Sequence, residues 1–300
     1  MKISRFHLIL GSVVGVALAA NVVLWQQDRH WLKDMIQVIT LLSSPNFGLP
    51  EYKNYRNDEP CKDGPDIAEC EYEKSEWRLL NDENDPEGLA LLTSAANRGY
   101  ADAQEELGYK FLLGQGVPRD PKKAVELLEG AANQGSVTSQ AFLARLYEEG
   151  RAVKLDYAES LNWYRLAADQ GDDDSMTSLG DLLRQGKGAP KNPVEAVNWY
   201  GRAAELGNTD AMDRLSEMNF AGEGLERNQV TGLFWLFCRL ELFKTTSTDA
   251  RYKEIMDQDF SKEQKKIALL SGAMSEQDVA AARRRADAWI AAHPKLLKYR

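Results

Sequence analysis

Residues 167–207 read AADQGDDDSMTSLGDLLRQGKGAPKNPVEAVNWYGRAAELG, and this stretch decides the fold. It contains one pattern twice, an alanine pair followed by a glycine. The first copy is the pair at 167–168 with Gly171, and the second is the pair at 203–204 with Gly207. The copies lie 36 residues apart, which is a typical length for a repeated structural unit.

The same interval extends over half of the chain. Earlier alanine pairs are Ala95-Ala96 and Ala131-Ala132, and the glycines that follow them are Gly99 and Gly135. Two further columns keep the interval and comprise Gly114, Gly150, Gly186 and Gly222, and Leu107, Leu143, Leu179 and Leu215. A fixed period of this length predicts a solenoid of stacked helical units.

Short polar residues mark where the helices begin. Each of four such residues precedes an apolar-periodic stretch, where its side chain can accept from a free amide of the first turn: Asp120, Asp156, Asn192 and Asn228. Pro121 and Pro193 then occupy the first helical position, and Asp85-Pro86 repeats the device. The glycines after the alanine pairs suit the left-handed residue past a helix end. Each unit is therefore predicted to contain a helix A, a loop, a helix B and a tight turn.

These residues resemble a known repeat. The segment Leu107-Gly108-Tyr109-Lys110-Phe111, with the glycines and alanine pairs that come after it, closely resembles the Sel1-like repeat, a relative of the tetratricopeptide repeat. The resemblance covers residues 86–242. It implies an all-α fold, an α-solenoid of tetratricopeptide-like helical hairpins.

The last unit departs from the pattern, because Arg239 and Leu240 replace the alanine pair and Phe243 replaces the glycine. The helix around Trp235 is apolar nearly all round, which indicates that a C-terminal element covers it. We expect capping helices at 249–258, 262–271 and 276–292.

The predicted organisation has four parts. Residues 1–25 form a signal anchor or signal peptide, residues 26–85 a linker with an N-terminal capping helix at 71–80, residues 86–243 the solenoid, and residues 244–300 the C-terminal helical cap.

The N-terminus carries an export signal. Lys2 and Arg5 precede an apolar run from Leu8 to Trp25, which is either a signal peptide or a single membrane-spanning helix. Ala17-Leu18-Ala19 suits a peptidase, but the run continues to about the length that spans a bilayer, which favours an uncleaved anchor. We expect a periplasmic protein held in the inner membrane by residues 8–25, with the positive flank in the cytoplasm.

The cysteines fit that compartment. Cys61 and Cys70 bracket a short loop containing Gly64 and Pro65 and are predicted to form a disulfide. Cys238, within an apolar run, is predicted to be a small buried hydrophobic residue.

Charge and composition narrow the function. A formal net charge of −9 and a pI near 5.1 argue against nucleic acid as the partner and favour a basic or mixed protein partner. The three histidines, His7, His30 and His293, lie near the termini, and no catalytic motif occurs. The acidic run 172–174 lacks the spacing of a calcium loop. We predict a non-enzyme without catalytic residues, metal site or cofactor.

The resemblance implies a concave binding side, lined in the first repeat by positions 102, 105, 109, 112 and 113. Carried through four units, these positions hold two basic residues, Arg145 and Arg184, and nine acidic ones: Asp102, Glu105, Glu148, Glu149, Asp174, Asp181, Asp210, Asp213 and Glu217. The large apolar or aromatic residues there are Tyr109, Leu112 and Phe220.

From this set we predict eight partner-binding residues: Tyr109, Leu112, Arg145, Glu148, Asp181, Arg184, Glu217 and Phe220. An alternative stays open, in which the acids form only a solvated face and the aromatic rings lie in the seams between repeats.

Two classes of function compete. The resemblance implies a binding protein of the cell envelope that neutralises or regulates a protein partner, such as an immunity protein against a secreted lipase effector of a type VI system or a periplasmic signalling regulator. The other class is a structural adaptor in an envelope assembly. The residues themselves do not separate the two.

Overall fold

The computed structural model describes residues 61, 64, 66–243 and 250–297, and every regular element in those residues is a helix. The predicted anchor 1–25 and the linker before Cys61 lie outside the described residues. Within the described part, none of the helices has the length and apolarity needed to cross a membrane. The chain forms two compact units that divide between Ala131 and Ala132.

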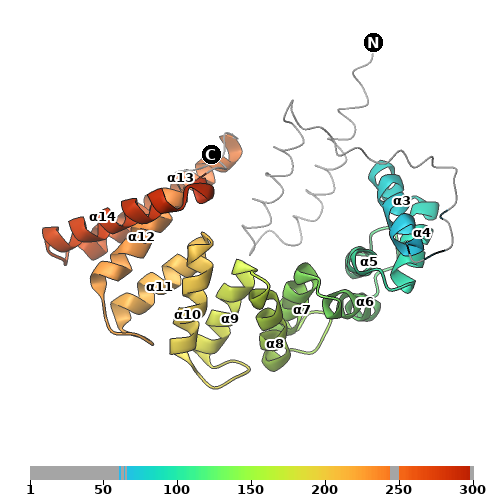
Figure 1. Ribbon diagram of the computed structural model, residues 1–300, viewed down its shortest axis with the longest axis horizontal. Coiled ribbons are helices and arrows are strands. Elements are labelled where there is room, and N and C mark those ends of the chain that lie inside the picture. The colour runs from blue at the N-terminus through green and yellow to red at the C-terminus, as the bar shows by residue number, and fades with distance from the viewer. Residues whose placement is uncertain (1–60, 62–63, 65, 244–249, 298–300) are drawn as a thin grey trace, which may run out of the picture. The chain divides into compact units, whose positions relative to one another are not determined.

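The helices follow one another with short connections (Figure 1). They are α3 (Ile67–Asn81), α4 (Pro86–Asn97), α5 (Ala101–Leu113), α6 (Pro121–Asn133), α7 (Val137–Glu149), α8 (Tyr157–Asp169), α9 (Asp173–Gln185), α10 (Pro193–Glu205), α11 (Thr209–Ala221), α12 (Gln229–Phe243), α13 (Ala250–Ser271), α14 (Glu276–Ala292) and the 3-10 helix η1 (Pro294–Leu297). Helices α5, α7, α9 and α11 begin 36 residues apart and are the A helices; α6, α8, α10 and α12 are the B helices. This confirms an all-helical array of repeated hairpins.

The predicted N-caps of the B helices are confirmed. The carboxylate of Asp156 accepts from the amides of Ala158 at 3.0 Å and Glu159 at 3.2 Å, and Asn192 accepts from the amide of Glu195 at 3.2 Å. Asp85, Asp120 and Asn228 accept in the same way from the amides three residues ahead of them. Each cap satisfies an amide that has no partner inside the helix.

The glycine turns join each B helix to the next A helix directly. Gly171, with φ +102°, donates to Ala168 O at 3.1 Å, and the amide of Asp172 donates to Ala167 O at 3.2 Å. This is the Schellman arrangement. The side chain of Asp172 then accepts from the amide of Ser175 at 2.8 Å and caps α9. One residue therefore ends α8 with its backbone and begins α9 with its side chain.

Small residues let the helices of one hairpin approach closely. A Cβ at Gly180 would lie 2.6 Å from the ring of Tyr200, and one at Gly108 would lie 2.9 Å from Leu128. The alanine pair 203–204 of α10 is fully buried. Trp199 is buried in the second unit's core, and Trp163 and Trp235, one repeat before and after it, are partly buried against the same core.

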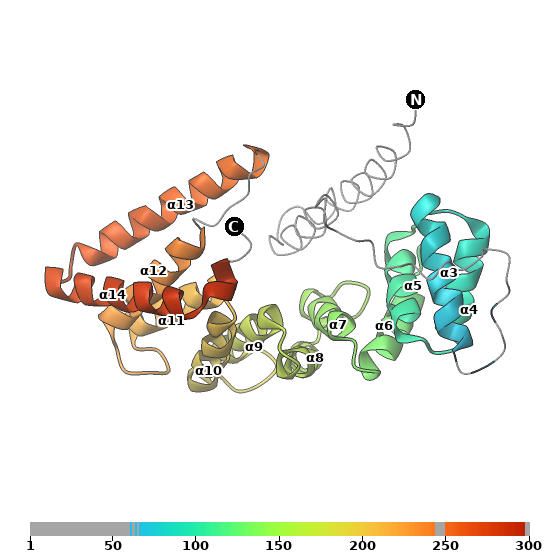
Figure 2. The same cartoon turned by 45° about the horizontal axis from the view of Figure 1, so that its top comes forward.

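The C-terminal helices pack on α12 (Figure 2). Helix α14 lies at the predicted 276–292. The prediction of separate helices at 249–258 and 262–271 is wrong, because α13 is continuous over both. Phe260 lies within the supposed break and packs against the core, and buried Glu263 and Ile267 follow it at helical spacing on the same side of α13. Glu263 pairs there with Arg239 of α12.

Candidate protein-binding surface

The A helices of the second unit are joined to their neighbours by side chains at the predicted binding positions. Asp181 of α9 accepts hydrogen bonds from Tyr200 Oη of α10 at 2.7 Å and from Arg214 Nε of α11 at 3.0 Å. Glu148 of α7 accepts from Tyr164 Oη of α8 at 2.9 Å. These carboxylates therefore hold neighbouring helices together.

Arg184 is also a predicted binding residue that joins neighbouring elements. Its guanidinium contacts Glu217 of α11 at 3.2 Å and Glu223, just past α11, at 2.9 Å, and Lys191 contacts Glu223 at 3.1 Å. Although partial burial opposes it, the hydrogen bonds from Lys191 and Arg184 hold the pKa of Glu223 below its usual range. The group stays ionised and ties α9 to the end of α11.

Burial and the neighbouring carboxylates also set the titration of the two tyrosines. Burial of the ring raises the pKa of Tyr200, and the adjacent charge of Asp181 raises it further. The pKa of Tyr164 is raised for the same two reasons, with Glu148 as the neighbour. Both hydroxyls therefore remain hydrogen-bond donors at neutral pH.

Much of the predicted negative surface in the second unit is neutralised from within. Besides the pairs above, Asp213 is paired with Lys266 of α13, and Glu149 with Arg151 at 2.9 Å. Asp210 on α11 is exposed. The structure gives Asp181, Arg184 and Glu217 a part in joining repeats, and their contact with a partner stays a prediction.

The predicted anchors are half-buried. Phe220 of α11 packs against Gly232 of α12, where an added Cβ would lie 2.7 Å from the ring. Phe220 therefore lies between the two helices of one hairpin, not in a seam between repeats. Tyr109 and Leu112 are half-buried on α5, and the guanidinium of Arg145 on α7 lies 5.1 Å from the Phe142 ring.

The first unit contains a helix that sequence reasoning identified only as a cap. Helix α3 stands one repeat before α5, so residues 66, 69, 73, 76 and 77 precede the five predicted binding positions of α5 by 36 residues. They are Asp66, Glu69, Glu73, Glu76 and Trp77. Extending the same 36-residue register backward would have found them.

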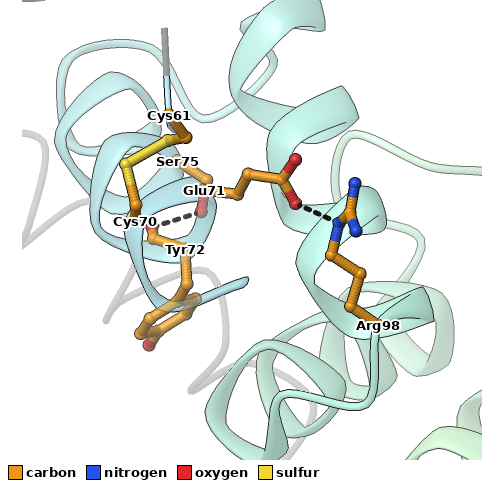
Figure 3. The surroundings of a disulfide bond; sticks show 6 residues. All are labelled: Cys61, Cys70, Glu71, Tyr72, Ser75 and Arg98. Carbon is orange, nitrogen blue, oxygen red and sulfur yellow. Dashed lines mark hydrogen bonds and ion pairs between the residues drawn. A yellow bond between two sulfur atoms is a disulfide. The ribbon is translucent and has the colours of Figure 1, made fainter. Parts of the chain in front are cut away.

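The start of α3 is fixed covalently and by a buried charge. Cys61 is joined by a disulfide to Cys70, with Cα atoms 5.9 Å apart (Figure 3). The next residue, Glu71, is buried and contacts Arg98 Nε, past the end of α4, at 3.1 Å. Ser75 Oγ, which is also buried, donates to Tyr72 O at 2.7 Å. The contact between Glu71 and Arg98 joins α3 to the end of α4.

The described residues contain no group of three or more histidine, cysteine or acidic side chains that could hold a metal ion. His7 and His30 lie outside the described residues, while His293 contacts Glu205 at 3.1 Å. Cys238 is a free and buried thiol whose pKa is raised by burial. Its predicted place in the core is confirmed.

The comparisons with known proteins agree with the repeat. The Sel1 repeat model matches residues 101–136, 137–172, 173–208 and 209–237. A protective antigen of uropathogenic Escherichia coli with an SLR fold is 27% identical at a TM-score of 0.55, covering 74% of this chain and 53% of that chain. A Sel1 repeat protein from Oxalobacter formigenes is 25% identical at a TM-score of 0.53, covering 62% of this chain and 83% of that chain.

The chain spans about half of the length of the E. coli protein. The structure of an immunity protein from Pseudomonas aeruginosa is 17% identical at a TM-score of 0.35, and the match covers 74% of this chain and 84% of that chain. A similarity this low does not bear on function. The comparison with curated proteins gives no match.

Proposed function

The chain is a Sel1-repeat protein, built on a fold that mediates protein–protein interaction, and from that premise we propose that it is a non-catalytic protein of the cell envelope that binds and neutralises or regulates a protein partner. The observation that carries the proposal is the repetition of one helix face. Helices α7, α9 and α11 present the same five positions, which hold seven carboxylates and two guanidinium groups. A surface of this kind suits an extended protein partner.

The proposed location is the periplasm, with residues 8–25 as an inner-membrane anchor. The positive flank and apolar run at the N-terminus support it. The disulfide between Cys61 and Cys70 also supports it, because such bonds persist in oxidising compartments. A reporter that is active only after export, fused behind Arg300, should be active. Activity of a cytoplasmic reporter at the same place would contradict this location.

The proposed role is neutralisation or regulation, and immunity against a secreted lipase-like effector is one form of it. The alternative is a structural adaptor or a periplasmic signalling regulator. Deletion of the chain separates the two roles by its effect on the cell. Loss of an adaptor should dissolve an envelope assembly, whereas loss of an immunity protein should expose the cell to a toxic partner.

Site-specific cross-linking tests the binding function. A photo-reactive residue at position 210, exposed on α11, should link the full chain to one partner protein in cells. The same residue at position 166, exposed on the B helix α8, is the matched control. The partner, once identified and purified, should bind the full chain saturably by calorimetry. A cross-linked protein that shows no saturable binding when purified, or no cross-linked protein at all, would contradict the proposal.

A further inference from the structure

We propose that the outward face of α3, together with α5 in the first unit, is a docking surface, and that it takes a basic protein segment that also carries apolar side chains. The inference rests on the proposed function and deepens it by naming the partner's chemistry. It starts from one stripe of α3, Glu73, Glu76, Trp77 and Leu80, whose spacing places them on one side of the helix.

The stripe lies opposite the side by which α3 is held. Glu71, Ser75 and Leu79 are buried, and they alternate along the helix with the stripe. Trp77 is 45% exposed and Leu80 is 53% exposed. On α5, Leu113 is 42% exposed and stands 36 residues after Trp77, in the same register position. Exposed tryptophan in such a setting is the residue type that most often anchors a protein interface.

Carboxylates of both helices gather around two tyrosine rings. Tyr72 of α3 and Tyr100, which precedes α5, have ring centroids 5.3 Å apart. The charges of Glu76, Glu106 and Asp102 act on Tyr72, and those of Asp102, Glu69 and Glu73 act on Tyr100. Burial raises the pKa of Glu76, and repulsion from Glu106 and Asp102 adds to it. The acids of α3 and α5 are therefore close enough to repel one another.

The described residues of the first unit compensate the charge of these acids only in part. Lys110 pairs with Glu106 at 3.5 Å within α5, and one carboxylate oxygen of Glu73 is buried with no hydrogen-bond partner. In the second unit, by contrast, arginines from neighbouring elements contact the corresponding carboxylates, as Arg214 does with Asp181. Like charges that are held together and only partly compensated by cations destabilise the free protein. A partner that brings lysine or arginine removes this repulsion, and its apolar side chains can cover Trp77 and Leu80.

A labelled peptide of alternating lysine and leucine is the probe, and a peptide with glutamate in place of lysine is its control. Titration of the full chain, followed by fluorescence anisotropy, should show saturable binding of the lysine peptide only. The double variant Glu73→Gln with Glu76→Gln should raise the Kd about tenfold, and Trp77→Ala should raise it by a similar factor. Trp77→Phe should restore most of the affinity.

The matched controls lie in the second unit. Glu159→Gln with Glu226→Gln removes the same number of carboxylates at exposed positions outside the predicted binding side, and Leu166→Ala removes an apolar side chain that is 49% exposed. Both should change the Kd by less than about twofold. Equal weakening by the controls would overturn the inference, because the peptide would then respond only to the net charge of the chain. Equal binding of both peptides, or binding of neither, would overturn it as well.

The two proposals fail separately. When the purified natural partner binds the full chain but its Kd is unchanged by Glu73→Gln with Glu76→Gln and by Trp77→Ala, the proposed function stands and the docking surface is elsewhere. Circular dichroism of each variant shows whether the fold is kept.

Discussion

The hydroxyl of Tyr200 donates a hydrogen bond of 2.7 Å to the carboxylate of Asp181, which joins a B helix to the A helix before it. Since Asp181 also accepts from Arg214, a charge reversal at this position disturbs the fold as well as any partner contact. Tyr200→Phe should lower the free energy of unfolding by about 1–2 kcal/mol, because it leaves the carboxylate short of one donor. Urea denaturation measures it, and Tyr157→Phe, a less buried tyrosine at the start of α8, serves as the control.

Gly171 and Gly201 should respond oppositely to a side chain. Gly171 has φ +102°, so Gly171→Val should destabilise the protein by about 1–3 kcal/mol. Gly201 lies inside α10 with nothing within 4 Å of an added Cβ, so Gly201→Ala should stabilise it by about 0.5–1 kcal/mol. Thermal melts of both variants test the pair. A stable Gly171→Val variant would contradict the turn geometry.

Ala152 occupies a position that three other repeats give to glycine. Its φ is +65°, and the corresponding residues Gly116, Gly188 and Gly224 have φ values of +70°, +76° and +73°. Ala152→Gly should therefore raise the free energy of unfolding by up to about 1 kcal/mol, since relief of the left-handed strain exceeds the entropy that glycine adds to the unfolded chain. Ala158→Gly, within helix α8, should lower it instead.

The three cysteines should differ in reactivity towards thiol reagents. Without reduction, mass spectrometry of digested protein should find the peptides of Cys61 and Cys70 linked, while buried Cys238 reacts with thiol reagents only after unfolding. Replacing Cys61 and Cys70 with serine should lower the stability of the first unit by about 2–3 kcal/mol. Two free thiols in protein recovered from the envelope would contradict the bond.

Glu76 should make the first unit less stable as the pH rises. Its folded pKa lies above the unfolded value because of burial and neighbouring carboxylates, so the folded state binds more protons between the two values. Stability from this group is therefore present below the unfolded pKa and is lost as pH rises through the folded pKa. Glu76→Gln should melt higher than wild type at neutral pH, and the difference should vanish in acid. A constant difference at all pH values would contradict this assignment.

Local rules predicted most of the fold. The caps at Asp156 and Asn192 and the turn at Gly171 follow from backbone chemistry, which acts within a few residues and is legible in one sequence. The length of α13 was misjudged, because Phe260 in the supposed break and Ile267 after it pack against the core of the second unit, and such tertiary packing leaves no local signal.

The candidate surface was predicted less completely. The register gave the positions on the A helices, but not that Asp181 and Arg184 would be engaged by neighbouring repeats. Such pairs join residues more than 30 positions apart, and their formation depends on side-chain geometry. The stripe on α3 was missed because Glu71 and Tyr72 stand where later repeats have leucine and a small residue, which hid the register.

The turn at Asp172 also limits how such a chain can change in length. Because this residue closes one helix with its amide and opens the next with its carboxylate, no position between the two helices can absorb an insertion. One added residue there would rotate every later helix and misplace the buried columns. Duplication or loss of a complete 36-residue module leaves every junction intact. Natural or engineered variants of this array should therefore differ in length by whole 36-residue modules.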